Sequence, residues 1–175
     1  MNNKIKVLLS EEQVDARIAE LGAQISKEYE GEEIFMICTL KGACFFACEL
    51  AKRITVPGAL DFMSVSSYGN SSVSSGKIIM KKDLEESIVG KNVIVVEDIV
   101  DTGRTLSYLM DNLKQRGPKS LKLCAMLDKP DRRVVDIKAD YTGFEIPDLF
   151  VIGYGLDYAQ RYRNLPYIGV LEVEE

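Results

Sequence analysis

Short runs of apolar, often β-branched residues alternate along the chain with stretches in which apolar residues recur every three or four positions. The runs are typical of buried strands, and the spaced stretches are typical of amphipathic helices. Strands are predicted over residues 33–39, 59–65, 77–81, 93–96, 121–127, 149–152 and 167–171, with a further short strand near the end of 131–142. Helices are predicted from residue 10 to about 29–31, from 43 to about 53, and over 106–113. This alternation predicts an α/β fold with a mainly parallel central sheet that is covered by helices on both faces.

Residues 1–175 are predicted to form a single domain. That length is enough to bury a sizeable core, and the sequence contains no internal repeat, low-complexity tail or interdomain linker. The first helix opens with Ser10-Glu11-Glu12-Gln13, which has the pattern of a capping box. Gly117-Pro118 ends the third helix.

Composition and charge indicate which partners the protein can bind, among nucleic acids, phosphate groups and membranes. The chain is 46% hydrophobic and 28% charged, with a net charge of −5, so a general affinity for nucleic acid is not indicated. Recognition of a phosphate group would therefore have to be local. No stretch is apolar enough to span a membrane, and the first residues lack the apolar region of a signal peptide, so we expect a cytoplasmic protein without membrane contact.

The four cysteines and the absence of histidine restrict the chemistry further. Cys38, Cys44, Cys48 and Cys124 all lie in apolar segments without a CxxC pair, and we expect them to be small buried hydrophobic residues rather than zinc ligands or disulfides. Without histidine, Ser-His-Asp and Cys-His catalysis and HExxH metal sites are excluded. A general base would have to be a carboxylate, Lys, Tyr, Cys or water.

The segment from Val93 to Thr105, VIVVEDIVDTGRT, carries the strongest chemical signal. A buried strand is followed by two carboxylates, Glu97 and Asp98, and then by a glycine-containing turn that leads into a helix. Ligands of open α/β sheets bind at this edge, and a turn at a helix N-terminus favours a phosphate group. The two acids can serve a metal ion, sugar hydroxyls or a developing cation. A phosphate site beside two carboxylates suits a phosphorylated sugar.

This segment resembles the phosphoribosyl-diphosphate (PRPP) signature of the type I phosphoribosyltransferases. The resemblance implies that Glu97 and Asp98 face the ribose hydroxyls and Mg²⁺. It also implies that the turn binds the 5′-phosphate of PRPP, with Asp101 as the general base at purine N7. The turn consists of Asp101-Thr102-Gly103-Arg104-Thr105. Many relatives have Lys or an apolar residue in place of Arg104, but phosphate binding by the backbone does not depend on that side chain.

Further segments resemble one branch of this family, the hypoxanthine-guanine phosphoribosyltransferases. Leu40-Lys41-Gly42 matches the turn that meets pyrophosphate in the family, often with a cis peptide bond before the lysine, although an ordinary strand-to-helix turn is the simpler interpretation of these residues. Ser67-Tyr68 opens a Ser/Gly-rich stretch to Gly76 that resembles the family's flexible lid. A lid in this place would protect a reactive sugar cation from water. The alternative interpretation of the stretch is a plain hairpin loop.

The last matches concern the base and the pyrophosphate. Lys129 corresponds to the lysine that meets O6 of the purine, and Phe150 to the aromatic residue that stacks on it. Val151 pairs with the base edge through its backbone, and Asp157 binds Mg²⁺ near the pyrophosphate and lies beside the purine 2-position. Arg163 contacts pyrophosphate. All these roles are implications of the resemblance.

The resemblance as a whole implies a type I phosphoribosyltransferase fold with a small hood and a lid loop, active in purine salvage. The expected reaction is the Mg²⁺-dependent transfer of the phosphoribosyl group from PRPP to hypoxanthine or guanine, with release of pyrophosphate, by a homodimer or homotetramer. One alternative is a PRPP-sensing regulator on the same fold. Such regulators lose the base-handling residues and usually add a DNA-binding domain or a basic face. A further alternative is an enzyme for another base, such as xanthine.

Overall fold

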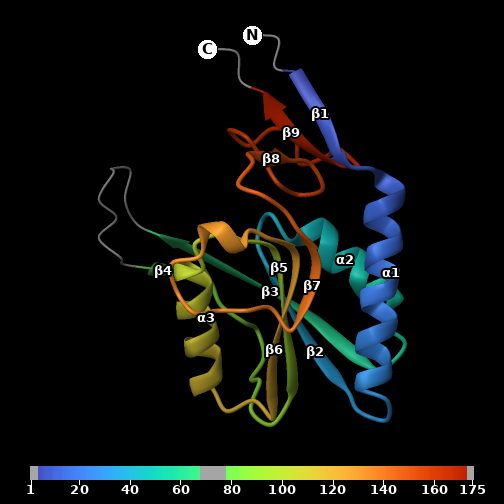
Figure 1. Cartoon of the computed structure of the whole chain (residues 1–175). Helices are drawn as coiled ribbons and strands as arrows, with labels where there is room; N and C mark the ends of the chain where they lie inside the picture. The colour runs from blue at the N-terminus through green and yellow to red at the C-terminus, as the bar shows by residue number, and fades with distance from the viewer. Residues whose placement is uncertain (1–3, 68–77, 173–175) are drawn as a thin grey trace.

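The computed structural model describes residues 4–67 and 78–172, which form a large sheet, a small sheet and three α-helices (Figure 1). The large sheet has the order β4-β3-β2-β5-β6-β7, in which only β4 runs antiparallel to its neighbour. Its strands are β2 (Ile34–Thr39), β3 (Gly58–Ser67), β4 (Ile78–Lys82), β5 (Asn92–Val100), β6 (Ser120–Asp128) and β7 (Tyr141–Glu145). The predicted α/β fold with a mainly parallel sheet is therefore confirmed.

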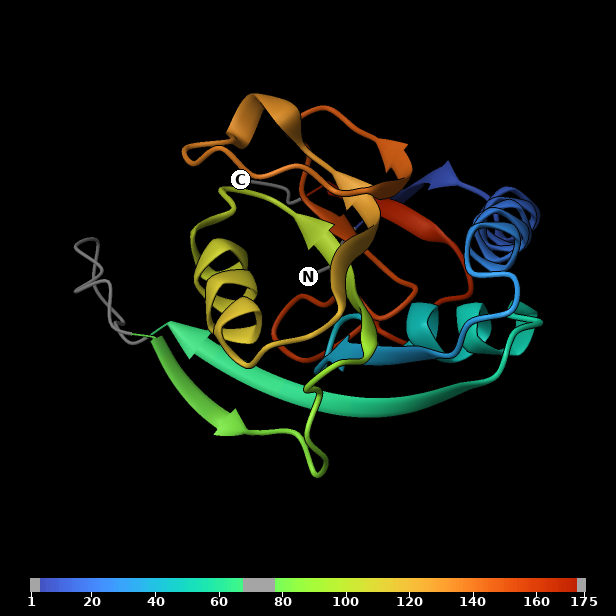
Figure 2. The same cartoon turned by 90° about the horizontal axis from the view of Figure 1, so that it is seen from below.

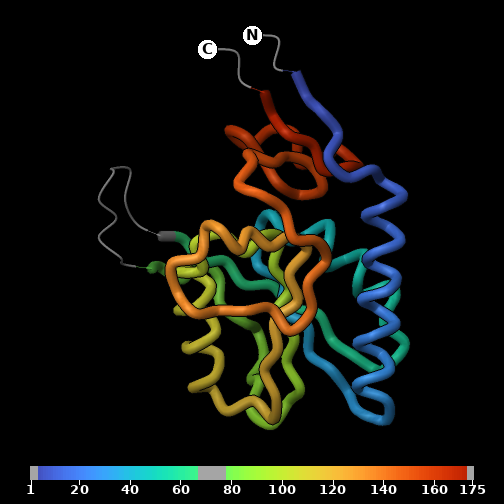
Figure 3. The backbone as a smooth tube through the Cα atoms, in the orientation of Figure 1, coloured from blue at the N-terminus to red at the C-terminus, as the bar shows by residue number. Residues whose placement is uncertain are grey.

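The small sheet is antiparallel and has the order β1-β9-β8. Its strands are β1 (Lys4–Leu9), β8 (Val151–Ile152) and β9 (Ile168–Glu172). Together with residues 153–167 it forms the part of the molecule that we call the hood, which lies at the top of Figure 1. The tube in Figure 3 shows that both ends of the chain leave from this part.

The helices cover the large sheet on both faces (Figure 2). They are α1 (Glu11–Glu28), α2 (Cys44–Arg53) and α3 (Arg104–Gln115), with a 3₁₀ turn, η1, at Pro130–Arg132. Strand β5 shows how both faces are filled, because successive side chains of a strand point to opposite sides. Ile94 and Val96 belong to the cluster under α1 and α2, whereas Val93 and Val95 belong to the cluster under α3.

The predicted capping box of α1 is present. The backbone N–H of Gln13 donates to Ser10 Oγ at 3.3 Å, and the N–H of Ser10 donates to Gln13 Oε1 at 2.9 Å. These bonds satisfy two backbone groups that the helix start leaves without an intrahelical partner. No described helix is long and apolar enough to cross a membrane.

Three features differ from the sequence-based expectations. Strand β1 was not predicted, because its residues do not alternate between buried and exposed positions and its place depends on pairing with β9. Strand β5 continues past the predicted end at residue 96, so Glu97 and Asp98 lie within the strand. The prediction that all cysteines are buried is wrong for Cys48, which is exposed, and for Cys44, which is partly exposed, because both line an open cavity beside α2.

The carboxyl ends of the parallel strands β2, β5 and β6 point toward the hood (Figure 1). In open α/β sheets, ligands bind outside these strand ends. The predicted lid begins at Ser67, the last residue of β3, whereas Tyr68 and the rest of the predicted lid lie outside the described residues.

Candidate functional site

The turn between β5 and α3 has the geometry of an anion-binding turn. Gly103 directly precedes α3 and has a left-handed backbone with φ 81°. A Cβ at this position would lie 2.6 Å from the side chain of Ile137 and 2.9 Å from that of Val135, so the turn requires glycine for both conformation and space. The start of α3 presents free backbone N–H groups beyond this turn, and such groups favour a phosphate.

A cavity of about 300 Å³ opens over this turn. It lies between the ends of β2 and β5 and the start of α3. Its lining residues are Thr39, Leu40, Val65, Glu97, Ile99, Val100, Asp101, Thr102, Gly103, Thr105, Leu106 and Leu109. The predicted phosphate-binding residues therefore surround one cavity, with the exception of Arg104, whose side chain does not line it.

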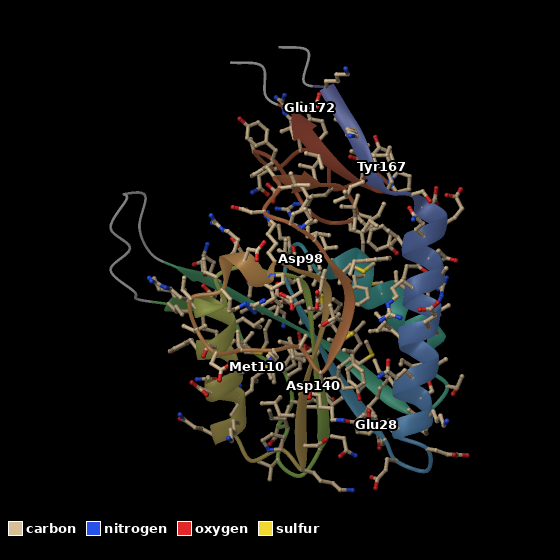
Figure 4. The ribbon with its side chains drawn as sticks, viewed as in Figure 1. Glu28, Asp98, Met110, Asp140, Tyr167 and Glu172 are labelled. Carbon is tan, nitrogen blue, oxygen red and sulfur yellow. The ribbon has the colours of Figure 1, made fainter. Side chains whose placement is uncertain are left out.

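Glu97 lines this cavity, and its neighbour Asp98 lines the second cavity described below. Burial, followed by the charge of Asp98, raises the pKa of Glu97 well above its usual range. The Oδ1 atom of Asp98 accepts a hydrogen bond from the N–H of Ile99 at 2.8 Å. Figure 4 shows Asp98 between the large sheet and the hood. A bound cation or hydroxyl donors would relieve the repulsion between these two carboxylates.

The turn after β2 brings a second backbone segment to the same carboxylates. The Leu40-Lys41 peptide bond is cis, as the family resemblance implies. A Cβ at Gly42 would lie 1.5 Å from Asp98 Oδ2, so a larger residue here would force this carboxylate or the turn to move. The Lys41 Nζ atom donates to Gln160 Oε1 in the hood at 3.3 Å. The turn thus spans the gap between Asp98 and the hood.

A second cavity, of about 500 Å³, lies between the ends of β5 and β6 and the hood. Its lining residues are Asp98, Ile99, Asp101, Lys129, Arg132, Asp148, Phe150, Val151, Leu156 and Asp157. All residues predicted to bind the purine are among them. We call this cavity the purine cavity, after that prediction.

Lys129 and Phe150 differ sharply in exposure within the purine cavity. Lys129 is only 8% exposed, and its Nζ atom lies 3.6 Å from Asp148 Oδ1. Phe150 is 52% exposed, and its ring meets that of Tyr158 edge to face at 5.6 Å between centroids. An exposed aromatic ring at the rim of a cavity is available for stacking on a flat ligand, which a core phenylalanine is not.

The hood segment that carries Asp157 is held by its own polar contacts. Arg163 Nη2 lies 2.7 Å from Asp157 Oδ1, and Arg163 Nη1 donates to the carbonyl of Gly155 at 2.6 Å. The N–H of Gln160 donates to Asp157 Oδ2 at 2.8 Å. Asp157 lines the purine cavity. Arg163 pairs with Asp157 but lines neither cavity.

The two cavities share Ile99 and Asp101. Lys41 and Gly42 lie beside them without lining either one. Sequence reasoning missed Arg132 and Asp148 as members of the purine cavity. Asp148 directly precedes the predicted strand that carries Phe150, whereas Arg132 lies in a polar run with no pattern of its own.

The three predicted metal ligands do not converge into a ready-made metal site. Within the described part of the chain, no group of three or more Cys, Asp or Glu side chains is placed to hold a metal ion. Glu97 and Asp98 are neighbours on β5, and Asp157 faces them from the hood. This sparse set of oxygen donors still fits Mg²⁺, which in proteins often uses one or two carboxylates, water and phosphates of the substrate.

A larger cavity of about 690 Å³ lies elsewhere, between the start of α1, α2 and the hood. Four of the residues that line it are carboxylates, namely Glu11, Glu12, Asp15 and Glu49. Such a surface opposes a polyanion such as a sugar diphosphate. None of the predicted site residues lines it, so we assign the candidate site to the two smaller cavities.

Comparisons with known proteins identify the family of the chain. The family model described as phosphoribosyl transferase domain matches residues 5–159. The chain is 53% identical over 167 residues to a hypoxanthine-guanine phosphoribosyltransferase of Bacillus subtilis, which covers 95% of this chain and 93% of the relative. A crystal structure of a hypoxanthine-guanine phosphoribosyltransferase from Bacillus anthracis superposes with a TM-score of 0.92 at 50% identity, over 97% of this chain and 100% of the other.

A further relative is longer than this chain. A bifunctional protein TilS/HprT of Listeria monocytogenes is 54% identical over 175 residues, which amount to 99% of this chain but only 27% of the relative. The chain therefore spans about a quarter of the length of that protein.

Proposed function

The chain belongs to the phosphoribosyltransferase family, within its hypoxanthine-guanine branch, and on that premise we propose that it joins hypoxanthine or guanine to PRPP in purine salvage. The products are the nucleoside 5′-monophosphate and pyrophosphate. The observation that supports this most is that a phosphate turn and a cavity with a buried lysine and an exposed aromatic ring meet at Asp101. A sugar phosphate in the first cavity and a flat base in the second would place their reacting atoms at this shared boundary.

The residues divide the proposed work between the two substrates. The backbone N–H groups of the turn at residues 101–105 and the hydroxyls of Thr102 and Thr105 bind the 5′-phosphate. Glu97 and Asp98 face the ribose hydroxyls, and their negative charge favours the positive charge that develops at the anomeric carbon. Lys129 donates to O6 of the base, and Phe150 stacks on its ring.

Mg²⁺ is proposed as the cofactor, held by Glu97, Asp98 and Asp157 together with oxygens of PRPP. It would neutralise charge on the departing pyrophosphate. Lys41 and Arg163 supply further positive charge near the same group. We also propose a homodimer or homotetramer, on the family resemblance.

The proton that leaves N7 as N9 attacks the sugar is proposed to go to Asp101. Its carboxylate lines both cavities and is 43% exposed, so a substrate can reach it. Among the residues that line both cavities it alone can accept a proton, because the other is Ile99.

Asp101→Asn is expected to lower kcat by about 10²–10⁴, the usual contribution of a general acid–base group. Asparagine keeps the size and the polar contacts of the turn, so PRPP binding stays nearly intact. Steady-state rates and calorimetric PRPP binding test this. Asp131→Asn, an exposed aspartate on η1 that lines neither cavity, is the matched control and keeps wild-type rates. An unchanged kcat in a well-folded Asp101→Asn protein would remove Asp101 from this role.

Gly42→Ala tests the contact between the β2 turn and Asp98. The added methyl group would overlap Asp98 Oδ2, so either the carboxylate or the turn must move. A displacement of about 1 Å at a reacting centre costs about 10²-fold in rate, and we expect a loss of this size in kcat/KM for PRPP. Thermal unfolding measured in parallel separates this effect from a loss of fold. Wild-type kcat/KM in the variant would show that the contact has no catalytic consequence.

A further inference from the structure

Four charged side chains of the purine cavity form a chain of alternating sign. Asp101 Oδ1 accepts from Arg132 Nε at 3.0 Å, and Arg132 Nη1 lies 3.5 Å from Asp148 Oδ2. Asp148 Oδ1 in turn lies 3.6 Å from Lys129 Nζ. We propose, resting on the function above, that Arg132 is a positioning residue that holds Asp101 and, through Asp148, Lys129 in place to read one edge of the purine.

The need for such a residue follows from the charges of the two groups that read the base. Asp101 is negative, Lys129 is positive, and both face one cavity. The atoms that they are proposed to meet, N7 and O6, are neighbours on the same edge of a 6-oxopurine. A direct ion pair between the two side chains would occupy the space that this edge requires. In the described part of the chain no ion pair joins them, because each has a partner of its own.

The backbone that carries Arg132 is fixed to the phosphate turn. The N–H of Arg132 donates to the carbonyl of Lys129 at 3.1 Å, which closes the 3₁₀ turn. The next residue, Arg133, points inward, pairs with Asp128, and donates to the carbonyl of Ile137 at 3.0 Å. Two residues after Arg132, the N–H of Val134 donates to the carbonyl of Thr102 at 3.1 Å. Arg132 therefore extends into the purine cavity from a segment whose position is set by the phosphate site.

The strength of the contacts suits a positioning role. The side chains of Arg132 and Asp148 are 45% and 53% exposed, and ion pairs at such exposure are weak. An incoming base can therefore displace Asp148 from Lys129 at small cost, while the hydrogen bond from Arg132 to Asp101 stays in place. Lys129 is buried, so Asp148 keeps its ammonium group paired until the O6 atom arrives.

The first test compares Arg132→Gln and Arg132→Lys with the matched control Arg116→Gln. Arg116 also pairs with an aspartate, Asp83 at 2.7 Å, but lines neither site cavity. We expect Arg132→Gln to lower kcat with hypoxanthine by about 10- to 100-fold, as misplacement of a reacting group does, and to raise KM for hypoxanthine. KM for PRPP should stay within about twofold, and Arg132→Lys should recover only part of kcat, because an ammonium group keeps the charge but does not bridge both aspartates as the guanidinium does.

The second test is a double-mutant cycle with Asp148→Asn. If the charges act as one chain, the double variant is no slower than the slower single variant, so the two effects do not multiply. Independent effects that multiply, or an Arg132→Gln enzyme with the rates of Arg116→Gln, would overturn the inference. A general fall in stability with both KM values raised would also overturn it, since that is the signature of a merely structural residue. These outcomes leave the proposed function intact, whereas a wild-type protein that forms no nucleotide would overturn the function and the inference together.

Discussion

Removal of divalent metal with EDTA is expected to bring nucleotide formation down to the detection limit, and addition of Mg²⁺ is expected to restore it. The reason is electrostatic. Glu97 lines the cavity proposed for the sugar phosphate, Asp98 and Asp157 line the adjoining purine cavity, and PRPP is itself a polyanion. Burial and the charge of Asp98 already raise the pKa of Glu97 well above its usual range in the free protein. Without a cation between them, these carboxylates would repel the substrate rather than bind it.

The measurement follows IMP formation from PRPP and hypoxanthine in metal-free buffer, and then with increasing Mg²⁺. Circular dichroism with and without EDTA is the control, because metal removal should leave the fold unchanged. Glu97→Gln should change the Mg²⁺ concentration at half-maximal activity, whereas Glu86→Gln, on the surface far from both cavities, should not. Full turnover in a metal-free assay would contradict the proposed cofactor.

The second large effect concerns Lys129. An ammonium group can only donate hydrogen bonds, so it suits the O6 atom of hypoxanthine and opposes the 6-amino group of adenine. Because Lys129 is only 8% exposed, adenine would place its donating 6-amino group against a buried donor, and neither group would gain an acceptor from the other. A site built in this way can discriminate by about 10⁴-fold, whereas shape alone provides about 10²-fold. We therefore expect Lys129→Gln, whose amide both donates and accepts, to reduce the preference for hypoxanthine over adenine toward the lower value.

The ratio of kcat/KM for the two bases measures this preference. Lys119→Gln is the matched control, because Lys119 is an exposed lysine that pairs with Glu32 at 2.8 Å far from the purine cavity. It should keep the wild-type ratio. A Lys129→Gln enzyme that rejects adenine as strongly as the wild type would show that another group reads the 6-position.

The fold was largely predictable because its main signals are local. The run at residues 93–96 predicts a buried strand by itself, and the glycine of the following turn is required by the left-handed conformation of Gly103. Strand β1 was missed because its extended conformation depends on pairing with β9, at the other end of the chain, and its own residues carry no strand pattern. The exposure of Cys48 was missed for a related reason, because apolar neighbours in sequence do not reveal which side of a helix faces the sheet.

In the candidate site too, residues with a local sequence signal were predicted, and a residue placed by distant contacts was missed. Residues with a motif of their own, such as Asp101 and Phe150, were predicted, and the structure brings them to one pair of cavities. Arg132 has no motif. Its position depends on a turn that is fastened through Val134 to Thr102, more than thirty residues earlier in the chain, so no local pattern could reveal it. The roles of these residues stay predictions until the variants are measured.

Transfer of a phosphoribosyl group to 6-oxopurines by this chain is tested by its rates with four bases. Nucleotide formation is followed with PRPP and Mg²⁺ against hypoxanthine, guanine, xanthine and adenine, each as kcat/KM. We expect hypoxanthine and guanine to react, xanthine to react poorly, and adenine to be lower than hypoxanthine by about 10⁴-fold. By the family resemblance, backbone carbonyls near Val151 and Asp157 meet the 2-position, where they accept from the 2-amino group of guanine and repel the 2-oxo group of xanthine. Xanthine equal to guanine would refute only this recognition of the 2-position. Adenine equal to hypoxanthine, or no nucleotide from any base, would contradict the proposed phosphoribosyl transfer to 6-oxopurines.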